Sequence, residues 1–189
     1  MFNWINNFDL KILLPLNRFF SRHGGFFNKF LAEYLIYSIP LILIFVWFWS
    51  KQAKKVALRA AFSAILAWPV LAQIIGKIIN RPRPFETSGV QELIFHRPSY
   101  SFPSDHAAAL FAIAFSFYLS GFKKLSYALF IIAIVISFFR VATGIHFPTD
   151  VIAGAVLGLL SAYLIDLFDK PLSIIYNFLI KIAKTLRLA

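Results

Sequence analysis

Long apolar runs separated by short polar stretches are the main pattern along this chain. Five of these runs are long enough to cross about 30 Å of hydrocarbon once tilt is allowed for. They predict membrane-spanning helices at residues 32–49, 58–79, 106–121, 125–141 and 151–168. The fold class predicted from this pattern is an all-α, polytopic transmembrane helix bundle.

Two flanking segments have a different pattern. Residues 2–20 and 172–188 mix apolar side chains with Asn, Lys and Arg at helical spacing, which is typical of amphipathic helices at the membrane interface. The first of them has a second interpretation as a sixth span, so we expect about five to six membrane helices. No linker, low-complexity tract or internal repeat divides the chain, which predicts one membrane-embedded domain over residues 1–189.

The composition agrees with a membrane location. Hydrophobic residues make up 60% of the chain, and the mean hydropathy is +0.75, well above what soluble domains show. The absence of cysteine excludes disulfides, thiolate metal sites and cysteine nucleophiles. The first residues lack the basic, apolar and small-residue pattern of a cleaved signal, so we expect internal spans to direct membrane insertion.

The net charge of +11 is spread between the apolar runs rather than gathered on one polar face, which argues against nucleic-acid binding. Three basic segments, "SKQAKK", "GFKK" and the tail after the last span, fall on one side of the predicted bundle. The positive-inside rule makes that side cytoplasmic. The connection at residues 80–105 and the turn "TGIHFPTD" then share the extracytoplasmic face, where most of the unusual polar residues lie.

The first polar cluster is "GKIINRPRPF". Lys77 lies near the end of the second predicted span, and Pro82 and Pro84 stop the helix and fix the direction of Arg83. Such cations favour an anionic ligand. The alternative is that they only extend toward the membrane interface.

The second cluster is "SFPSDHA". Ser104 or Asp105 at the start of an apolar helix predicts an N-cap, and a cap alone is one interpretation. A helix start also offers free amide groups and the positive end of the helix dipole, which together bind anions. A cap does not require His106, so the cluster also indicates a functional site.

The third cluster is "FFRVATGIHFPTDVIAG". Arg140 ends the fourth span, His146 lies in the turn, and Asp150 follows at a spacing of four, with Pro148 in the first helical turn. A carboxylate bonded to one ring nitrogen fixes the tautomer of a histidine and leaves the other nitrogen free to attack or to accept a proton. Charged groups at a span end are costly, which favours a functional role.

Together the clusters predict an electropositive pocket that suits a phosphoryl group passing through a charged transition state. Metal binding is the alternative, because two histidines and several acids share this face. It is disfavoured because Arg83 and Arg140 would oppose a bound cation. We therefore expect neither a metal nor another cofactor.

These residues resemble the type 2 phosphatidic acid phosphatase superfamily. Its signature has three parts: Lys, six residues, Arg-Pro; then Pro-Ser-Gly-His; then Ser-Arg, five residues, His, three residues, Asp. The order and the spacing of the third part match over residues 77–150. Three positions depart from the signature: Gly76 occupies the lysine position with Lys77 one residue later, Asp105 replaces glycine, and Phe139 replaces serine.

The sequence is most similar to the bacitracin-resistance branch of bacterial undecaprenyl diphosphatases. The Pro-Ser-Asp-His variant, the "RPRPF" ending, His96 and the short chain carry this resemblance. It implies a location in the bacterial cytoplasmic membrane with the active site on the extracytoplasmic side.

The resemblance also implies roles for individual residues. His146 would be the nucleophile that forms a phosphohistidine, Asp150 would orient it, and His106 would protonate the leaving oxygen. The residues implied to hold the substrate are Arg83, Ser104, Arg140 and Lys77, with Asp105 beside them as a mark of diphosphate specificity or a modulator of a nearby Arg or His.

The predicted function is hydrolysis of undecaprenyl (prenyl) diphosphate to the monophosphate and phosphate, with the bilayer and the lipid as partners. Other lipid phosphates remain as alternative substrates: phosphatidylglycerophosphate, phosphatidic acid and lipid A. A lipid or anion transporter would also place charges in the membrane, and a purely structural membrane protein is the last alternative.

Overall fold

The computed structural model describes residues 3–86, 89–96 and 99–188, and the described chain consists of helices and loops. The α-helices are α1 (Asn3–His23), α2 (Gly25–Lys29), α3 (Ser38–Trp49), α4 (Lys51–Ile65), α5 (Gln73–Ile79), α6 (Asp105–Leu119), α7 (Lys123–Ala142), α8 (Pro148–Leu167) and α9 (Asp169–Thr185). Short π- and 3-10-helical turns join α2 to α3 over residues 30–37 and α4 to α5 over residues 66–72, and a further 3-10 turn, Pro84–Glu86, lies beyond α5.

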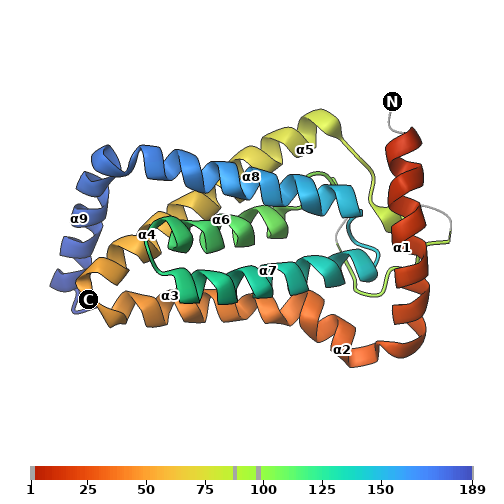
Figure 1. The fold of residues 1–189 in the computed structure, drawn as a ribbon, viewed down its shortest axis with the longest axis horizontal. Coiled ribbons are helices and arrows are strands. Elements are labelled where there is room, and N and C mark those ends of the chain that lie inside the picture. Colours follow the sequence, from red (N-terminus) through yellow and green to blue (C-terminus); the bar gives the residue numbers. More distant parts are fainter. Residues whose placement is uncertain (1–2, 87–88, 97–98, 189) are drawn as a thin grey trace.

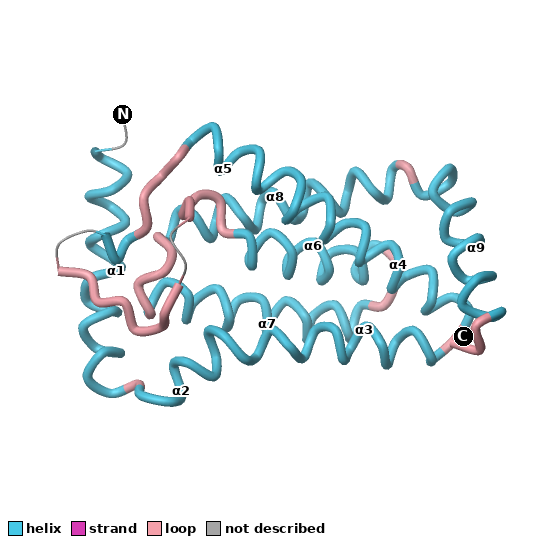
Figure 2. The backbone as a smooth tube through the Cα atoms, turned by 180° about the vertical axis from the view of Figure 1, so that it is seen from behind, coloured by secondary structure: helices cyan, strands magenta, loops and turns pink. Residues whose placement is uncertain are grey.

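Five helices run side by side along the long axis of the molecule: α3, α4, α6, α7 and α8 (Figure 1). The two flanking helices, α1 and α9, lie across opposite ends of this bundle. Seen from behind, the long connection between α5 and α6 and the turn between α7 and α8 gather at the end where α1 lies (Figure 2). The connections that carry the three polar clusters therefore meet at one end of the bundle.

Four helical segments are long and apolar enough to span a membrane: Gly25–Trp49, Lys51–Glu86, Lys123–Ala142 and Pro148–Leu167. The fifth predicted span, α6, has 15 residues, or about 22 Å at 1.5 Å per residue. Most of its length is buried among the other helices. The chain is thus an all-helical membrane protein with α6 as a short helix inside the bundle.

The second span begins earlier than the predicted residue 58, and it contains a π-helical turn that was not predicted. The basic segment "SKQAKK", predicted as a loop, is the first turn of α4, since Lys, Gln and Ala favour helix. Only Ser50 breaks the helix, and its hydroxyl accepts a hydrogen bond from the Ala53 amide at 3.1 Å. Farther along, Pro69 lies within the π-helical turn Leu66–Ala72, which accommodates a residue that has no amide hydrogen to donate.

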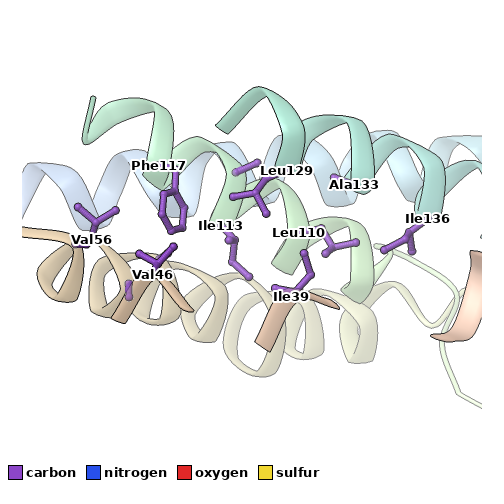
Figure 3. Packing of buried hydrophobic residues seen from close by; sticks show 13 residues of the cluster. Ile39, Val46, Val56, Leu110, Ile113, Phe117, Leu129, Ala133 and Ile136 are labelled. Carbon is purple, nitrogen blue, oxygen red and sulfur yellow. The ribbon is translucent and has the colours of Figure 1, made fainter. Parts of the chain in front are cut away.

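The apolar core lies where α3, α4, α6 and α7 face one another. Its buried members include Val46, Ile113, Phe117 and Leu129 (Figure 3). Phe117 is fully buried in this group. This core lies along the bundle, away from the polar end.

The closest helix contact joins α6 to α8. A Cβ atom added to Gly154 would lie 2.3 Å from the Ser104 carbonyl oxygen, and one added to Gly158 would lie 2.3 Å from the Ala108 carbonyl oxygen. The two backbones therefore touch with no side chain between them, as small residues allow in membrane helix pairs. The Ser104 amide donates to the Asp150 carbonyl oxygen at 2.9 Å, which fixes the two helix starts together.

We expect Gly154→Ala to separate α6 from α8, because the new methyl group would collide with backbone that cannot rotate away. Overpacking of this kind lowers the free energy of unfolding by about 1–3 kcal/mol. Thermal unfolding in detergent measures the effect. Val156→Ile adds the same carbon count on an exposed face of α8 and serves as the control; equal stability of the two variants would contradict this account of the contact.

Candidate active site

His146 is the buried centre of the polar end. It lies in the turn between α7 and α8, with 1% of its surface exposed. Its Nδ1 atom lies 2.8 Å from the Ser101 carbonyl oxygen. A carbonyl oxygen only accepts, so Nδ1 carries the proton of the neutral ring. The other ring nitrogen, Nε2, lies 3.4 Å from a guanidinium nitrogen of Arg83, which only donates. The lone pair of the ring is therefore on Nε2.

The surroundings of His146 favour its neutral form. Burial lowers its pKa to about 4, because the charged ring loses its hydration. The positive charges of Arg140 and Arg83 lower the pKa further, while Asp150 acts in the opposite direction. At neutral pH the ring is unprotonated on Nε2 and is able to act as a nucleophile.

Asp150, in the first turn of α8, lies close to His146 but is not bonded to it. Its Oδ2 atom is 3.7 Å from His146 Nδ1, beyond hydrogen-bond distance. The same oxygen accepts from the Phe147 amide at 2.8 Å, and Oδ1 accepts from Arg81 at 2.6 Å. The sequence-based expectation that Asp150 fixes the tautomer of His146 is corrected here, because the Ser101 carbonyl already bonds Nδ1.

Arg81 and Asp9 form a buried ion network that the sequence analysis did not identify. The Arg81 guanidinium binds Asp9 and Asp150, both at 2.6 Å. Asp9 also accepts from the amide of Thr149 at 3.0 Å and from its hydroxyl at 2.6 Å. The face of the Arg81 guanidinium rests on the Phe147 ring, 3.9 Å from its centroid. The network joins α1, the loop after α5 and the start of α8.

Asn17 makes a second attachment between α1 and the loops of the site. Its amide nitrogen donates to the carbonyl oxygens of Gln91 at 2.9 Å and Ala142 at 3.1 Å. Its amide oxygen accepts from the Gln91 backbone at 2.8 Å. Asn17 is fully buried. Because α1 is attached at both Asp9 and Asn17, it is fixed against the loops that carry the site.

The charges of two buried arginines act on His146, and one of them, Arg83, lies 3.4 Å from its Nε2 atom. Arg83, 2% exposed, donates to the Ser99 hydroxyl at 2.8 Å and to the carbonyl oxygens of Tyr100 and Ile145 at 3.0 Å. Arg140, at the end of α7, is 3% exposed, and one of its terminal nitrogens approaches the Ala32 carbonyl oxygen at 3.4 Å.

Arg140 has donor capacity left for a ligand. Within the described residues, its Nε and second terminal nitrogen have no hydrogen-bond partner although both are buried. A buried guanidinium with free donors is costly unless an acceptor fills the space. An anion with several oxygens, such as a phosphoryl group, meets that need.

The start of α6 supplies the remaining groups of the site. Ser104 is fully buried, and its hydroxyl accepts from the Ala107 amide at 3.5 Å, so it is the N-cap of the helix. Asp105 accepts from His106 Nδ1 at 2.9 Å, and the same oxygen lies 3.8 Å from His146 Nε2. Asp105 is therefore bonded to a histidine, which agrees with the second of its two sequence-based interpretations, a modulator of a nearby Arg or His.

Lys77 does not join this cluster. Its side chain is exposed on α5, whereas Gly76 is buried. A Cβ atom at Gly76 would lie 3.3 Å from the Phe102 carbonyl oxygen, so the position of the signature lysine faces the connection that leads to α6. A shift of one residue turns a helical side chain by about 100°, and Lys77 therefore points elsewhere. Its sequence-based assignment as a substrate ligand does not fit the structure.

An apolar groove of about 400 Å³ reaches Asp105 and His106. Its walls come from residues 36–43, from Ala64 and Trp68, and from α6, and its only charged or titratable lining residues besides Tyr37 are Asp105 and His106. Tyr37 and Trp68 are exposed at its rim. The groove is suited to an apolar chain whose polar end reaches His106.

In the described part of the chain, no three His, Asp or Glu side chains are grouped as ligands for a metal ion. What the cluster does offer is a neutral nucleophile at His146 Nε2, guanidinium groups beside it, and a second histidine 2.9 Å from a carboxylate. This combination suits transfer of an anionic group. Of the predicted site residues, the structure brings together all but Lys77, and it adds Asp9, Arg81 and Ser101.

Comparison with known proteins gives consistent matches. The family model described as the PAP2 superfamily matches residues 56–170. The bacitracin transport permease protein BcrC of Bacillus licheniformis is 34% identical over 151 residues, which are 79% of this chain and 74% of that protein. The undecaprenyl-diphosphatase BcrC of Bacillus subtilis is 30% identical over 166 residues, covering 86% of this chain and 85% of that protein.

A solved structure also matches the fold. The crystal structure of Aquifex aeolicus LpxE superposes with a TM-score of 0.61 at 25% sequence identity. The match covers 82% of this chain and 93% of that one. The arrangement of the bundle is thus shared with a solved structure along most of both chains.

We expect Asp9→Asn to destabilise the protein, because it leaves the buried Arg81 with one carboxylate partner fewer. Breaking a buried ion pair costs about 3–5 kcal/mol of unfolding free energy. Asp169→Asn is the matched control: its carboxylate pairs with Arg59 at the opposite end and is 38% exposed, so its loss should cost less than about 1 kcal/mol. Thermal or denaturant unfolding in detergent compares the two, and equal losses would contradict this ranking.

Proposed function

Because this chain belongs to the PAP2 superfamily, we propose that it hydrolyses the terminal phosphate of a prenyl diphosphate in the membrane, above all undecaprenyl diphosphate. The products are the lipid monophosphate and inorganic phosphate. One observation supports this most directly: the apolar groove is lined by His106 and Asp105, and Asp105 lies 3.8 Å from His146 Nε2. A relative with 30% identity is named an undecaprenyl-diphosphatase, which supports this choice of lipid.

In the first step, His146 Nε2 attacks the terminal phosphorus. The bond from that phosphorus to the bridging oxygen breaks, and the oxygen leaves with the lipid monophosphate. His106 donates a proton to this leaving oxygen, and the phosphoryl group stays on His146. The Ser101 carbonyl keeps Nδ1 of His146 protonated during the attack. The phosphorylated ring is positively charged, and its Nδ1–H group still donates to this carbonyl oxygen.

In the second step, a water molecule attacks the phosphohistidine. His106, now neutral, accepts a proton from this water, and the phosphorus–nitrogen bond breaks. Phosphate leaves, and both histidines return to their starting forms. One residue thus acts first as acid and then as base, as microscopic reversibility requires.

Cationic side chains would stabilise the transferring phosphoryl group. Arg140 has unused donors, and Arg83 lies 3.4 Å from the nucleophilic nitrogen. The start of α6 next to Ser104 adds the positive end of a helix dipole. These groups are already in place before the substrate binds, which is the condition for efficient electrostatic stabilisation.

The proposal places the site at the extracytoplasmic face of the bacterial cytoplasmic membrane. The basic turns around Lys51, Lys54, Lys123 and Lys124 lie at the end of the bundle opposite the site, which the positive-inside rule assigns to the cytoplasm. We further propose that α1 and α9, which cross the ends of the bundle, are interfacial helices and that α6 completes a set of five membrane helices.

We expect purified protein in detergent to release phosphate from undecaprenyl diphosphate, and His146→Ala to abolish this release because no nucleophile remains. His106→Ala should lower kcat by about 10²–10⁴-fold, since it removes the acid and base. Lys77→Ala is the matched cation control and should stay within a few-fold of wild type.

The same assay separates the alternatives. Full activity of His146→Ala would contradict the mechanism, and loss of activity with a chelator would favour a metal-dependent reaction. Faster release from phosphatidylglycerophosphate, phosphatidic acid or a lipid A phosphate would reassign the substrate. Movement of lipid without bond cleavage would identify a transporter.

The pH dependence follows from the neutral state of His146. The attacking form lacks a proton on Nε2, and the pKa of this group is about 4. Protonation of His146 should therefore remove activity only as the pH falls toward 4, not at the pH near 6.5 where an ordinary histidine titrates. A profile of kcat/KM against pH, corrected for substrate ionisation, measures this limb. A loss of kcat/KM near pH 6.5 that is assigned to protonation of His146 would contradict the claim that this buried histidine stays neutral.

A further inference from the structure

One carboxylate oxygen lies between the two histidines of the site. Asp105 Oδ1 is 2.9 Å from His106 Nδ1 and 3.8 Å from His146 Nε2. It also accepts from the His106 amide at 2.8 Å. The helix cap is Ser104, so the position of Asp105 is not explained by capping of α6.

The two histidines have different partners at Nδ1. For His146 the partner is the neutral Ser101 carbonyl, and for His106 it is the carboxylate of Asp105. A carbonyl holds the tautomer without strongly favouring the charged ring. A carboxylate holds the same tautomer and also stabilises the imidazolium by its charge. The carbonyl therefore leaves the ring of His146 neutral, whereas the Asp105 carboxylate offsets part of the cost that burial and the charge of Arg140 place on a protonated His106.

We propose that Asp105 is the positioning residue of His106: it holds Nδ1 protonated and stabilises the imidazolium, so that Nε2 delivers a proton to the leaving oxygen. This inference rests on the proposed phosphatase function. It changes the interpretation of the Asp variant of the Pro-Ser-Gly-His motif, because Asp105 acts through a histidine and does not bind the substrate.

The location of His106 agrees with this role. His106 lines the apolar groove, in which the lipid part of the leaving group would lie. Since Nδ1 faces Asp105, Nε2 is the ring nitrogen left for the substrate. The side chains of Asp105 and His106 are 24% and 25% exposed, so both reach the space that a ligand enters.

A direct bond from Asp105 to the phosphoryl group is disfavoured by charge. A carboxylate and a phosphate oxygen repel each other, and at about 4 Å and an effective dielectric constant near 20 two unit charges interact by about 4 kcal/mol. The charged and titratable groups that act on the Asp105–His106 pair are Arg83, Arg140 and His146. The two guanidinium groups offset the carboxylate and leave the site able to accept an anion.

Histidine ¹⁵N NMR in detergent tests the pairing without a substrate. The chain has four histidines, and His106→Gln assigns the signal of interest. In Asp105→Asn the amide oxygen still accepts from Nδ1, but the charge is lost. The titration midpoint of His106 should therefore fall by about 1–3 pH units while the Nδ1-protonated tautomer persists. Asp105→Ala should also lose the tautomer preference.

Kinetics provides the second readout. Asp105→Asn should lower kcat on undecaprenyl diphosphate by at least about tenfold, as expected for a weakened general acid. KM should stay equal or fall, because an anion is removed from a site that binds an anion. The basic limb of the kcat profile should move to lower pH together with the NMR midpoint. Glu92→Gln neutralises an exposed carboxylate and is the control in both experiments.

The outcomes are distinct. An unchanged His106 midpoint in Asp105→Asn, or a raised KM with unchanged kcat, would overturn the inference and make Asp105 a substrate-binding residue. If wild-type protein releases no phosphate, the proposed function fails, whereas a shifted midpoint still supports the Asp105–His106 pairing.

Discussion

The contact between α6 and α8 is the constraint on which the site depends. Burial of apolar side chains adds little to helix association inside a bilayer, so packing has to hold the helices together. Gly154 and Gly158 let the α8 backbone touch carbonyl oxygens of α6. Each helix starts at the polar end, and the Ser104 amide bonds the Asp150 carbonyl oxygen there. His106 and His146 thus come within reach of one carboxylate because two backbones meet without side chains between them.

Charge is organised around this contact in two layers. The positive charges that act on His146 belong to Arg83 and Arg140, and Arg140 keeps free donors among the described residues. Behind them, Arg81 is neutralised by Asp9 and Asp150, which removes it from ligand binding and attaches α1 to α8. Neighbouring arginines of one "RPRP" segment therefore have different tasks. Arg81 supports the structure, and Arg83 lies 3.4 Å from His146 Nε2.

Much of the fold followed from the sequence because apolar length and helical period are local properties. Four of the spans, the two flanking helices and the meeting of three motifs at one end were predicted in this way, whereas the fifth predicted span is the short helix α6. The helix-to-helix contacts were not, since Asp9 and Arg81 are 72 positions apart; the only hint was an acid in an N-terminal segment that is otherwise basic and apolar. The Ser101 carbonyl at His146 was equally hidden, because any residue can supply a backbone oxygen.

The groove at the flank of the bundle determines how a lipid would arrive. Tyr37 and Trp68 line the groove and are exposed on the surface of the helix bundle. If this surface faces lipid, as we propose for the spans, a long-chain lipid would enter sideways while its tail stays among other lipids. The rate at which the protein and the lipid meet then depends on their diffusion in the plane of the membrane. It also depends on the mole fraction of the lipid in its leaflet, not on a bulk concentration. Dilution of the membrane with inert lipid would slow turnover even when the amounts of protein and substrate stay constant.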